Sequence, residues 1–142
     1  MLLRPLLLLI LKFMSINSRD QFLLKGRPEI PSIQNTTKTL DLEVFQNKVL
    51  RPILKLQNTI FVSVFLDELR RKKQDFKTFN SEEKHEAIQR HFNTNSSLKQ
   101  RFLGIVIGLF TNAEMDYYEW HISAINKRIF SMLKTRLEDQ LI

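Results

Sequence analysis

The chain has 142 residues, contains no cysteine and carries a formal net charge of +7 at pH 7. Its length suits one domain with a single core, and an apolar fraction of 43% that includes eleven phenylalanines excludes disorder throughout. The lack of cysteine excludes disulfides, zinc–thiolate sites and a thiol nucleophile, while three glycines and four prolines are too few for a many-turned all-β fold.

The positive charge is concentrated toward the N-terminus. Residues 1–13 and residues 14–39 each contribute a net +2, so 16 basic and 13 acidic residues stand from Leu40 onward. A surface that binds nucleic acid by releasing counterions needs clustered basic residues. The part of the chain expected to fold is only mildly basic, so its charge alone does not favour a nucleic-acid partner.

Residues 1–13, "MLLRPLLLLILKF", admit three interpretations. The apolar run ends at Lys12 after six residues, whereas a secretory leader has about 7–15 apolar residues and then a small-residue cleavage site, which is missing. A membrane span needs about 20 apolar residues. We favour a mispredicted start upstream of Met14, which would make the protein cytoplasmic; a leader or a surface-lying anchor would mean export or membrane anchoring.

Residues 14–39 are predicted to form an extended arm. Gly26, Pro28 and Pro31 lie close together, and proline restricts both itself and the preceding residue to extended backbone. The polar run 35–37 competes with helix formation. The apolar side chains expected to dock this arm on the body are Phe22, Leu23 and Leu24.

A long helix is predicted from Thr39, as N-cap, to about residue 73. Pro52 either kinks this helix or begins a second one at its first turn. Apolar residues cover nearly three sides of the helix, which is more than a small bundle can bury. The sequence therefore predicts a homodimer or another homo-oligomer, or a partner helix, that covers the excess. One apolar stripe contains Val49, Ile53, Leu56, Ile60 and Val64.

Three further helices are predicted. One begins at Asn80, which stands in capping-box spacing with Glu83, and ends before the "NTNSS" break, where Ser96 or Ser97 caps the next. The apolar stretch 102–110 fits either a buried helix or a buried strand by periodicity, and the lack of a partner strand favours a helix. In that helix, Gly104 and Gly108 would share one face and permit close packing.

The last helix is expected from the Thr111–Glu114 capping box to about residue 140, as one continuous element. Apolar residues recur at steps of three and four along it for more than six turns.

The residues that could catalyse a reaction or bind a metal lie near the start of this last helix. Glu114, Tyr117, Tyr118 and His121 stand at steps of three and four, so a carboxylate, two phenols and an imidazole would share a face. Glu114, Tyr118 and His121 are the candidate catalytic residues, and Glu114 and His121 the candidate metal ligands. Helix capping and side-chain packing also explain the presence of these residues. We favour this structural interpretation over the catalytic one and expect no cofactor.

The other two histidines offer no metal motif. His85 and His91 are six residues apart, which places them on different faces of one helix, and the His-x-x-x-His spacing of zinc helices is missing.

The basic run Arg70, Arg71, Lys72 and Lys73 is the candidate nucleic-acid contact. It also stands at a predicted helix C-terminus, where cations complement the helix dipole. The solvated helix end is the favoured interpretation.

Two stretches, "FQNKVLRPILKLQN" and "GIVIGLFTNAEMDYY" with "NKRIFSMLKTRLEDQ", resemble a group of short, uncharacterised all-helical bacterial proteins. The resemblance covers roughly residues 45–140. Some members carry a glyoxalase label, which implies metal-dependent methylglyoxal–glutathione lyase chemistry. The His and Glu ligands on strands of isomerising glyoxalases and the Thr-His-x-His-x-Asp-His motif of the hydrolase type are missing from this sequence.

The sequence therefore predicts an all-α protein in which residues 40–142 form a single bundle of four or five helices, preceded by the extended arm. The predicted function is a helical interaction or regulatory module that self-associates and has no transmembrane span. The alternatives are a glyoxalase-like lyase, which follows from the resemblance, and nucleic-acid binding.

Overall fold

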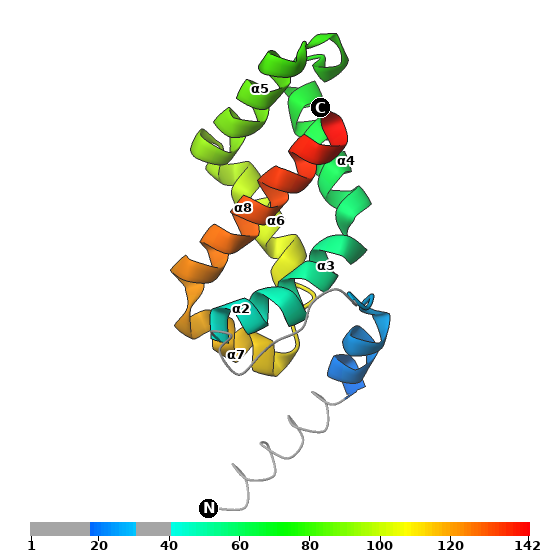
Figure 1. Cartoon of the computed structure of the whole chain (residues 1–142), viewed down its shortest axis with the longest axis vertical. Coiled ribbons are helices and arrows are strands. Elements are labelled where there is room, and N and C mark those ends of the chain that lie inside the picture. Colours follow the sequence, from blue (N-terminus) through cyan, green and yellow to red (C-terminus); the bar gives the residue numbers. More distant parts are fainter. Residues whose placement is uncertain (1–17, 31–40) are drawn as a thin grey trace, which may run out of the picture.

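The computed structural model describes residues 18–30 and 41–142 (Figure 1). Within these ranges the chain forms seven α-helices, α2 to α8, a further helical stretch at residues 18–26, and no strand. The predicted all-α class is confirmed. The helices outnumber the predicted four or five because the first long element, for which one helix or two were expected, contains three α-helices, and the last predicted helix is two. Residues 1–17 and 31–40, with the predictions made for them, lie outside the described residues.

The extended arm was predicted wrongly over residues 18–26, which are helical. The helix-breaking residues begin only at Gly26 and Pro28, and the preceding "SRDQFLLK" contains no residue that interrupts a helix. Apolar docking is also incorrect for Phe22, whose side chain is 78% exposed.

The first long helix bends sharply, but not at the proline. α2 (Asp41–Phe45), the π-helical turn η1 (Gln46–Leu50) and α3 (Arg51–Leu56) run on as one rod, and α4 (Asn58–Arg71) follows at 63° after Gln57. Pro52 lies in the first turn of α3. Since its ring crowds the carbonyl four residues earlier, the π turn provides a wider local path and the rod continues.

The middle of the chain forms the predicted helices. α5 (Ser81–Thr94) begins at the Asn80–Glu83 capping box, after the short 3₁₀ helix η2 (Phe76–Thr78). α6 (Ser96–Ile107) is a helix rather than a strand, and its N-cap is Asn95 instead of a serine, because the Asn95 side chain accepts a hydrogen bond from the Leu98 N–H at 3.0 Å.

The glycine face of α6 does not make the predicted close contact. Gly104 and Gly108 are exposed, and a Cβ atom at Gly104 would meet nothing within 4 Å. Among the described residues, no helix therefore packs closely against Gly104.

The predicted last helix is two helices, α7 (Asn112–Trp120) and α8 (Ile122–Leu141), and the break lies at His121. The His121 N–H donates to the Tyr118 carbonyl, while the His121 ring nitrogen Nδ1 lies 2.9 Å from the Tyr117 carbonyl oxygen. The side chain thus takes the place that the backbone N–H of residue 121 would hold in a continuous α-helix.

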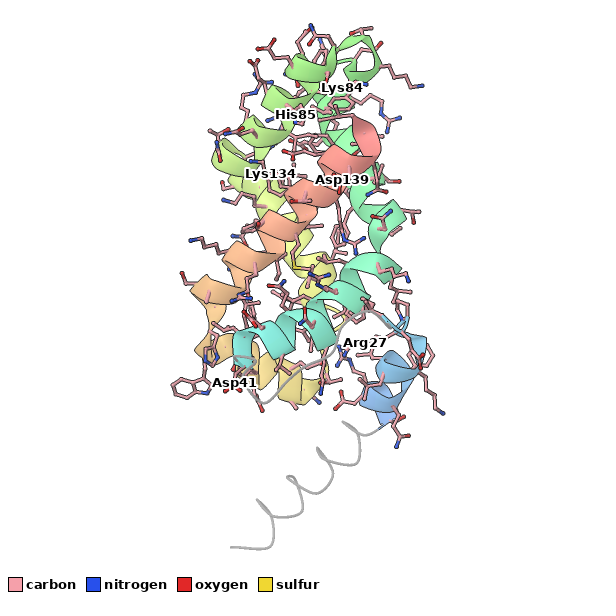
Figure 2. The ribbon with its side chains drawn as sticks, viewed as in Figure 1. Arg27, Asp41, Lys84, His85, Lys134 and Asp139 are labelled. Carbon is pink, nitrogen blue, oxygen red and sulfur yellow. The ribbon has the colours of Figure 1, made fainter. Side chains whose placement is uncertain are left out.

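The core lies between α4, α5, α6 and α8, which pack side by side in the upper part of Figure 1. Figure 2 shows Lys84 and His85 of α5 beside the C-terminal part of α8. Phenylalanine rings link these helices: Phe102 of α6 packs edge-on against Phe61 of α4 and stacks on Phe92 of α5, which contacts Phe130 of α8.

This core covers most of the apolar surface for which the sequence predicted an outside partner. Ile53, Phe61 and Phe65 are at most 2% exposed, whereas Leu56 and Ile60 remain 47% and 46% exposed at the bend. The helix itself therefore gives a weaker reason for a dimer than the sequence suggested, and self-association stays a prediction. Among residues 18–30 and 41–142, no single helix is long and apolar enough to cross a membrane.

Candidate binding site

The four residues predicted to share chemistry, three on α7 and His121 just after it, contact different partners. Glu114 caps α7: its carboxylate accepts from the Thr111 N–H at 2.9 Å, and its own N–H donates to the Thr111 hydroxyl at 3.2 Å. The same carboxylate accepts two hydrogen bonds from the Arg27 guanidinium, one of them at 2.7 Å. With side-chain exposures of 8% for Arg27 and 15% for Glu114, this is a largely buried ion pair.

The phenols of Tyr117 and Tyr118 and the imidazole of His121 also contact other groups of the protein. The Tyr118 hydroxyl donates to the Asn126 side-chain oxygen at 2.6 Å, and burial raises the pKa of Tyr118. Tyr117 stacks on Phe45 on one side and on His121 on the other, and burial, with the Asp41 charge, raises the pKa of Tyr117. Both phenols stay protonated near neutral pH, so neither is poised as a base.

The predicted metal ligands Glu114 and His121 belong to no group of side chains that could hold an ion. Within the described ranges, no group of three His, Asp or Glu side chains is close enough to hold an ion. His121 is occupied with Tyr117, and Glu114 with Arg27 and the α7 N-terminus. The predicted cluster therefore comes together only as a set of packing and capping contacts.

The other two histidines differ in environment. His85 is 53% exposed and lies 4.0 Å from Glu138, whereas His91 is only 4% exposed. The Asn95 side chain approaches His91 Nδ1 at 3.1 Å and also donates to Glu68. Burial, aided by the Lys72 and Arg90 charges, lowers the pKa of His91, so the ring is neutral near pH 7.

Three cations of the basic run at the end of α4 pair with two acidic residues of the same helix. Arg70 and Arg71 pair with Asp67 at 3.0 and 2.9 Å, and Lys72 pairs with Glu68 at 3.7 Å. Lys73 adopts a left-handed backbone with φ 57°, and the next N–H closes a Schellman motif by donating to the Leu69 carbonyl. These residues form a helix end, as favoured from the sequence.

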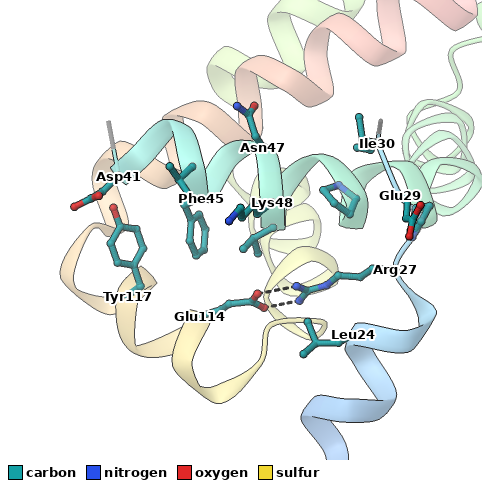
Figure 3. A pocket seen from close by; sticks show the side chains of 14 residues that line it. Leu24, Arg27, Glu29, Ile30, Asp41, Phe45, Asn47, Lys48, Glu114 and Tyr117 are labelled. Carbon is teal, nitrogen blue, oxygen red and sulfur yellow. Dashed lines mark hydrogen bonds and ion pairs between the residues drawn. The ribbon is translucent and has the colours of Figure 1, made fainter. Parts of the chain in front are cut away.

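A pocket of about 860 Å³ lies where residues 24–30 meet α2, η1 and α7 (Figure 3). Its size falls in the range of small-molecule sites, and its lining combines apolar side chains with charged ones. The apolar part includes Leu24, Ile30, Val44, Phe45, Val49 and Pro52. The polar part includes Arg27, Glu29, Asp41, Asn47, Lys48, Glu114 and Tyr117.

Sequence reasoning did not find this pocket, because one of its walls is the stretch predicted to be an extended arm. One local signal was present. Pro52 marks the irregular η1 turn beside the pocket, and irregular π turns are frequent at functional sites. Arg27 stands beside Pro28 in an otherwise mildly charged region, but its pairing with Glu114 spans 87 residues and no local pattern predicts it.

Residues 18–30, here called the N-terminal segment, are held on the body through polar groups. Arg19 donates to the Phe110 and Gly108 carbonyls at 2.8 and 3.1 Å, beyond the C-terminal end of α6. Asp20 accepts from the Asn112 N–H at the start of α7, at 3.2 Å. A cation at a helix C-terminus and an anion at an N-terminus both complement the helix dipoles.

The only tryptophan of the chain is close in sequence to a residue that lines the pocket, and its side chain is almost fully exposed. Trp120 is the last residue of α7 and has an exposed fraction of 86%. Tyr117, one turn earlier on the same helix, lines the pocket. Residues three apart share a helix face, so the pocket and the exposed indole belong to one end of α7.

Searches with family models, curated proteins and solved structures found no match for the chain. The resemblance to glyoxalase-labelled bacterial proteins accordingly stays a prediction from the sequence.

Proposed function

We propose that the protein is a non-enzymatic helical interaction module that self-associates by placing Trp120 of one copy in the pocket of a second copy. The observation that supports this proposal is the juxtaposition on α7 of a pocket-lining residue, Tyr117, and an indole that is 86% exposed three residues later. Tryptophan is among the residues enriched in the anchors that dominate protein interfaces.

The proposed contact is reciprocal. Because the pocket wall and the indole belong to the same helix, a twofold axis near α7 brings each Trp120 to the pocket of the other copy in a closed, isologous pair. The apolar lining residues Val44, Phe45 and Val49 match the indole ring, and Lys48, an exposed lining residue, is suited to meet Glu119, which is exposed beside Trp120.

The enzyme and nucleic-acid alternatives have less support. Glu114 and His121 already use their polar atoms in contacts that hold α7, and the cations of the residue 70–72 run are paired with Asp67 and Glu68.

Sedimentation velocity of the full chain at about 1–100 µM tests the proposal. We expect a dimer for the native sequence, and a monomer for Trp120→Ala and for Val44→Arg, which places a charge in the pocket. Ile60→Ala removes a different exposed apolar side chain and should leave the dimer unchanged. Circular dichroism checks that every variant folds.

The single tryptophan supplies a second readout. On dimerisation its emission should shift to the blue as the indole leaves water, and the Val44→Arg variant should lack the shift. A native chain that stays monomeric across this concentration range, or a Trp120→Ala variant with the same oligomeric state as the native chain, would disprove the proposal.

A further inference from the structure

The rod formed by η1 and α3 meets α8 along a row of polar side chains. Toward the start of η1, the Arg128 guanidinium of α8 donates to the Gln46 side-chain oxygen at 2.7 Å. Just past the bend, the Asn58 and Gln140 side chains exchange two hydrogen bonds, at 2.6 and 2.9 Å. These two contacts fix how the rod lies along α8, and they flank the residues that stand between them on both elements.

Between the two contacts, each element contributes an arginine. The Arg51 N–H donates to the Gln46 carbonyl, which is the i→i+5 hydrogen bond of the π turn. This wider turn brings Arg51 round toward the side of the rod on which Gln46 contacts α8. On α8, Arg136 belongs to the row of residues at steps of four that also contains Arg128 and Gln140. The register therefore brings the two arginines to facing positions.

The two guanidinium groups are close enough to repel each other. Arg136 is partly buried, and burial, followed by the Arg51 charge, lowers the pKa of Arg136. Arg51 is exposed, so the pair can be reached from solvent. Lys55, which is exposed one turn after Arg51, adds a third cation on the same side of α3. Positive charge is thus concentrated at a position that is open to the outside.

No side-chain carboxylate of the protein balances this charge. Within the described residues, the three cations form no ion pair with an acid. Of the acids next to Arg136 in sequence, Glu138 lies beside α5, and Asp139 is exposed. Residues 1–17 and 31–40 contain none of the fifteen Asp and Glu residues of the chain. The counter-charge for this cluster therefore has to come from another molecule.

We propose that Arg51, Lys55 and Arg136, here called the α3–α8 cation site, bind a phosphate-class anion: inorganic phosphate or the phosphoryl group of a small molecule. Guanidinium groups bind phosphate oxygens with two parallel hydrogen bonds, and a lysine ammonium adds a point charge. Partial burial strengthens the attraction at Arg136, because the surroundings screen charge less than water does. None of the three residues lines the large pocket, so this inference goes beyond self-association.

Isothermal titration calorimetry of the full chain with sodium phosphate, at about pH 7.5 and constant ionic strength, tests the proposal. Arg136→Gln should weaken phosphate binding about tenfold or more, and Arg51→Gln should weaken it as well. Arg90→Gln removes an exposed arginine of α5 and should leave binding unchanged. Titration with methyl phosphate distinguishes the two sources: equal affinity indicates a phosphoryl group on a larger molecule, and much weaker binding indicates the free anion.

Thermal unfolding supplies a second readout, which a purely structural role of the arginines would not reproduce. In phosphate-free buffer, Arg51→Gln should not lower the unfolding temperature, because it relieves the repulsion on Arg136. Added phosphate should raise the unfolding temperature of the native chain more than that of Arg51→Gln, since only binding to the folded state stabilises it.

Two results would overturn the proposal. The first is a native chain that releases no heat with phosphate and gains no more stability from it than from sodium chloride at equal ionic strength. The second is an Arg136→Gln variant that binds phosphate as tightly as the native chain. Because the α3–α8 cation site includes neither Trp120 nor a residue of the large pocket, the proposed dimer and the proposed anion site can fail separately.

Discussion

At the scale of single residues, His91 couples the stability of the fold to pH. Its ring is 4% exposed and packs edge-on against Phe65, and burial lowers its pKa below the value of about 6.5 that it has in the unfolded chain. The unfolded chain then binds the proton more readily than the folded one. The free energy of unfolding is therefore at its full value above about pH 6.5 and falls as the pH drops, by at most about 1.4 kcal/mol per pH unit.

Urea unfolding measured between about pH 5 and pH 8 checks this prediction. In His91→Phe, which keeps an aromatic ring but cannot titrate, the decline below about pH 6.5 should disappear. His85→Gln, at a histidine that is 53% exposed, should keep it. A decline of equal slope in His91→Phe would show that another group is responsible. Glu68, whose pKa is lowered mainly by the Asn95 hydrogen bond, acts only at lower pH, where that carboxylate takes up its proton.

At the scale of elements, the buried Arg27–Glu114 pair is expected to hold the N-terminal segment on α7. In Arg27→Met the Glu114 carboxylate, 15% exposed, loses its charged partner, and the segment loses its donor to the Leu109 carbonyl. We expect a loss of about 1–3 kcal/mol in the free energy of unfolding. We also expect faster hydrogen exchange at residues 18–26, measured by mass spectrometry, with little change in the core helices.

Thr111→Ala is the matched control for this prediction. It removes the other side of the Glu114 capping box and should fray the start of α7 at a cost of about 1 kcal/mol, while the Arg27 contact stays in place. If residues 18–26 keep their protection in Arg27→Met, the ion pair is not what holds the segment.

At the scale of elements, some features could be predicted from the sequence and others could not. Both capping boxes, at Asn80 and Thr111, were predicted, because they depend on residues three apart. The bend after Gln57 and the break at His121 were not predicted. At Gln57 no local signal marks the change of direction, and at His121 a side chain replaces a backbone donor. The pocket and the Arg27–Glu114 pair were missed because their residues come together only through tertiary packing.

At the scale of the whole molecule, the aromatic core joins α4, α5, α6 and α8 into one unit. The composition alone indicated a core rich in phenylalanine, but not which of the eleven rings are buried. The structure divides them: Phe102 has no exposed surface and contacts Phe61 and Phe92, whereas Phe22 is 78% exposed. The same substitution at these two positions should therefore have very different effects.

Phe102→Ala is expected to lower the free energy of unfolding by about 3–5 kcal/mol, because it removes buried apolar surface and leaves a cavity beside the rings of Phe61 on α4 and Phe92 on α5. Phe22→Ala should change it by no more than about 0.5 kcal/mol, since its ring already faces water. Urea unfolding followed by far-ultraviolet and near-ultraviolet circular dichroism gives both values. Because α4, α5, α6 and α8 share this core, the two signals should report one coincident transition in the native chain. Two separate transitions, or a Phe102→Ala variant as stable as Phe22→Ala, would contradict a single cooperative core.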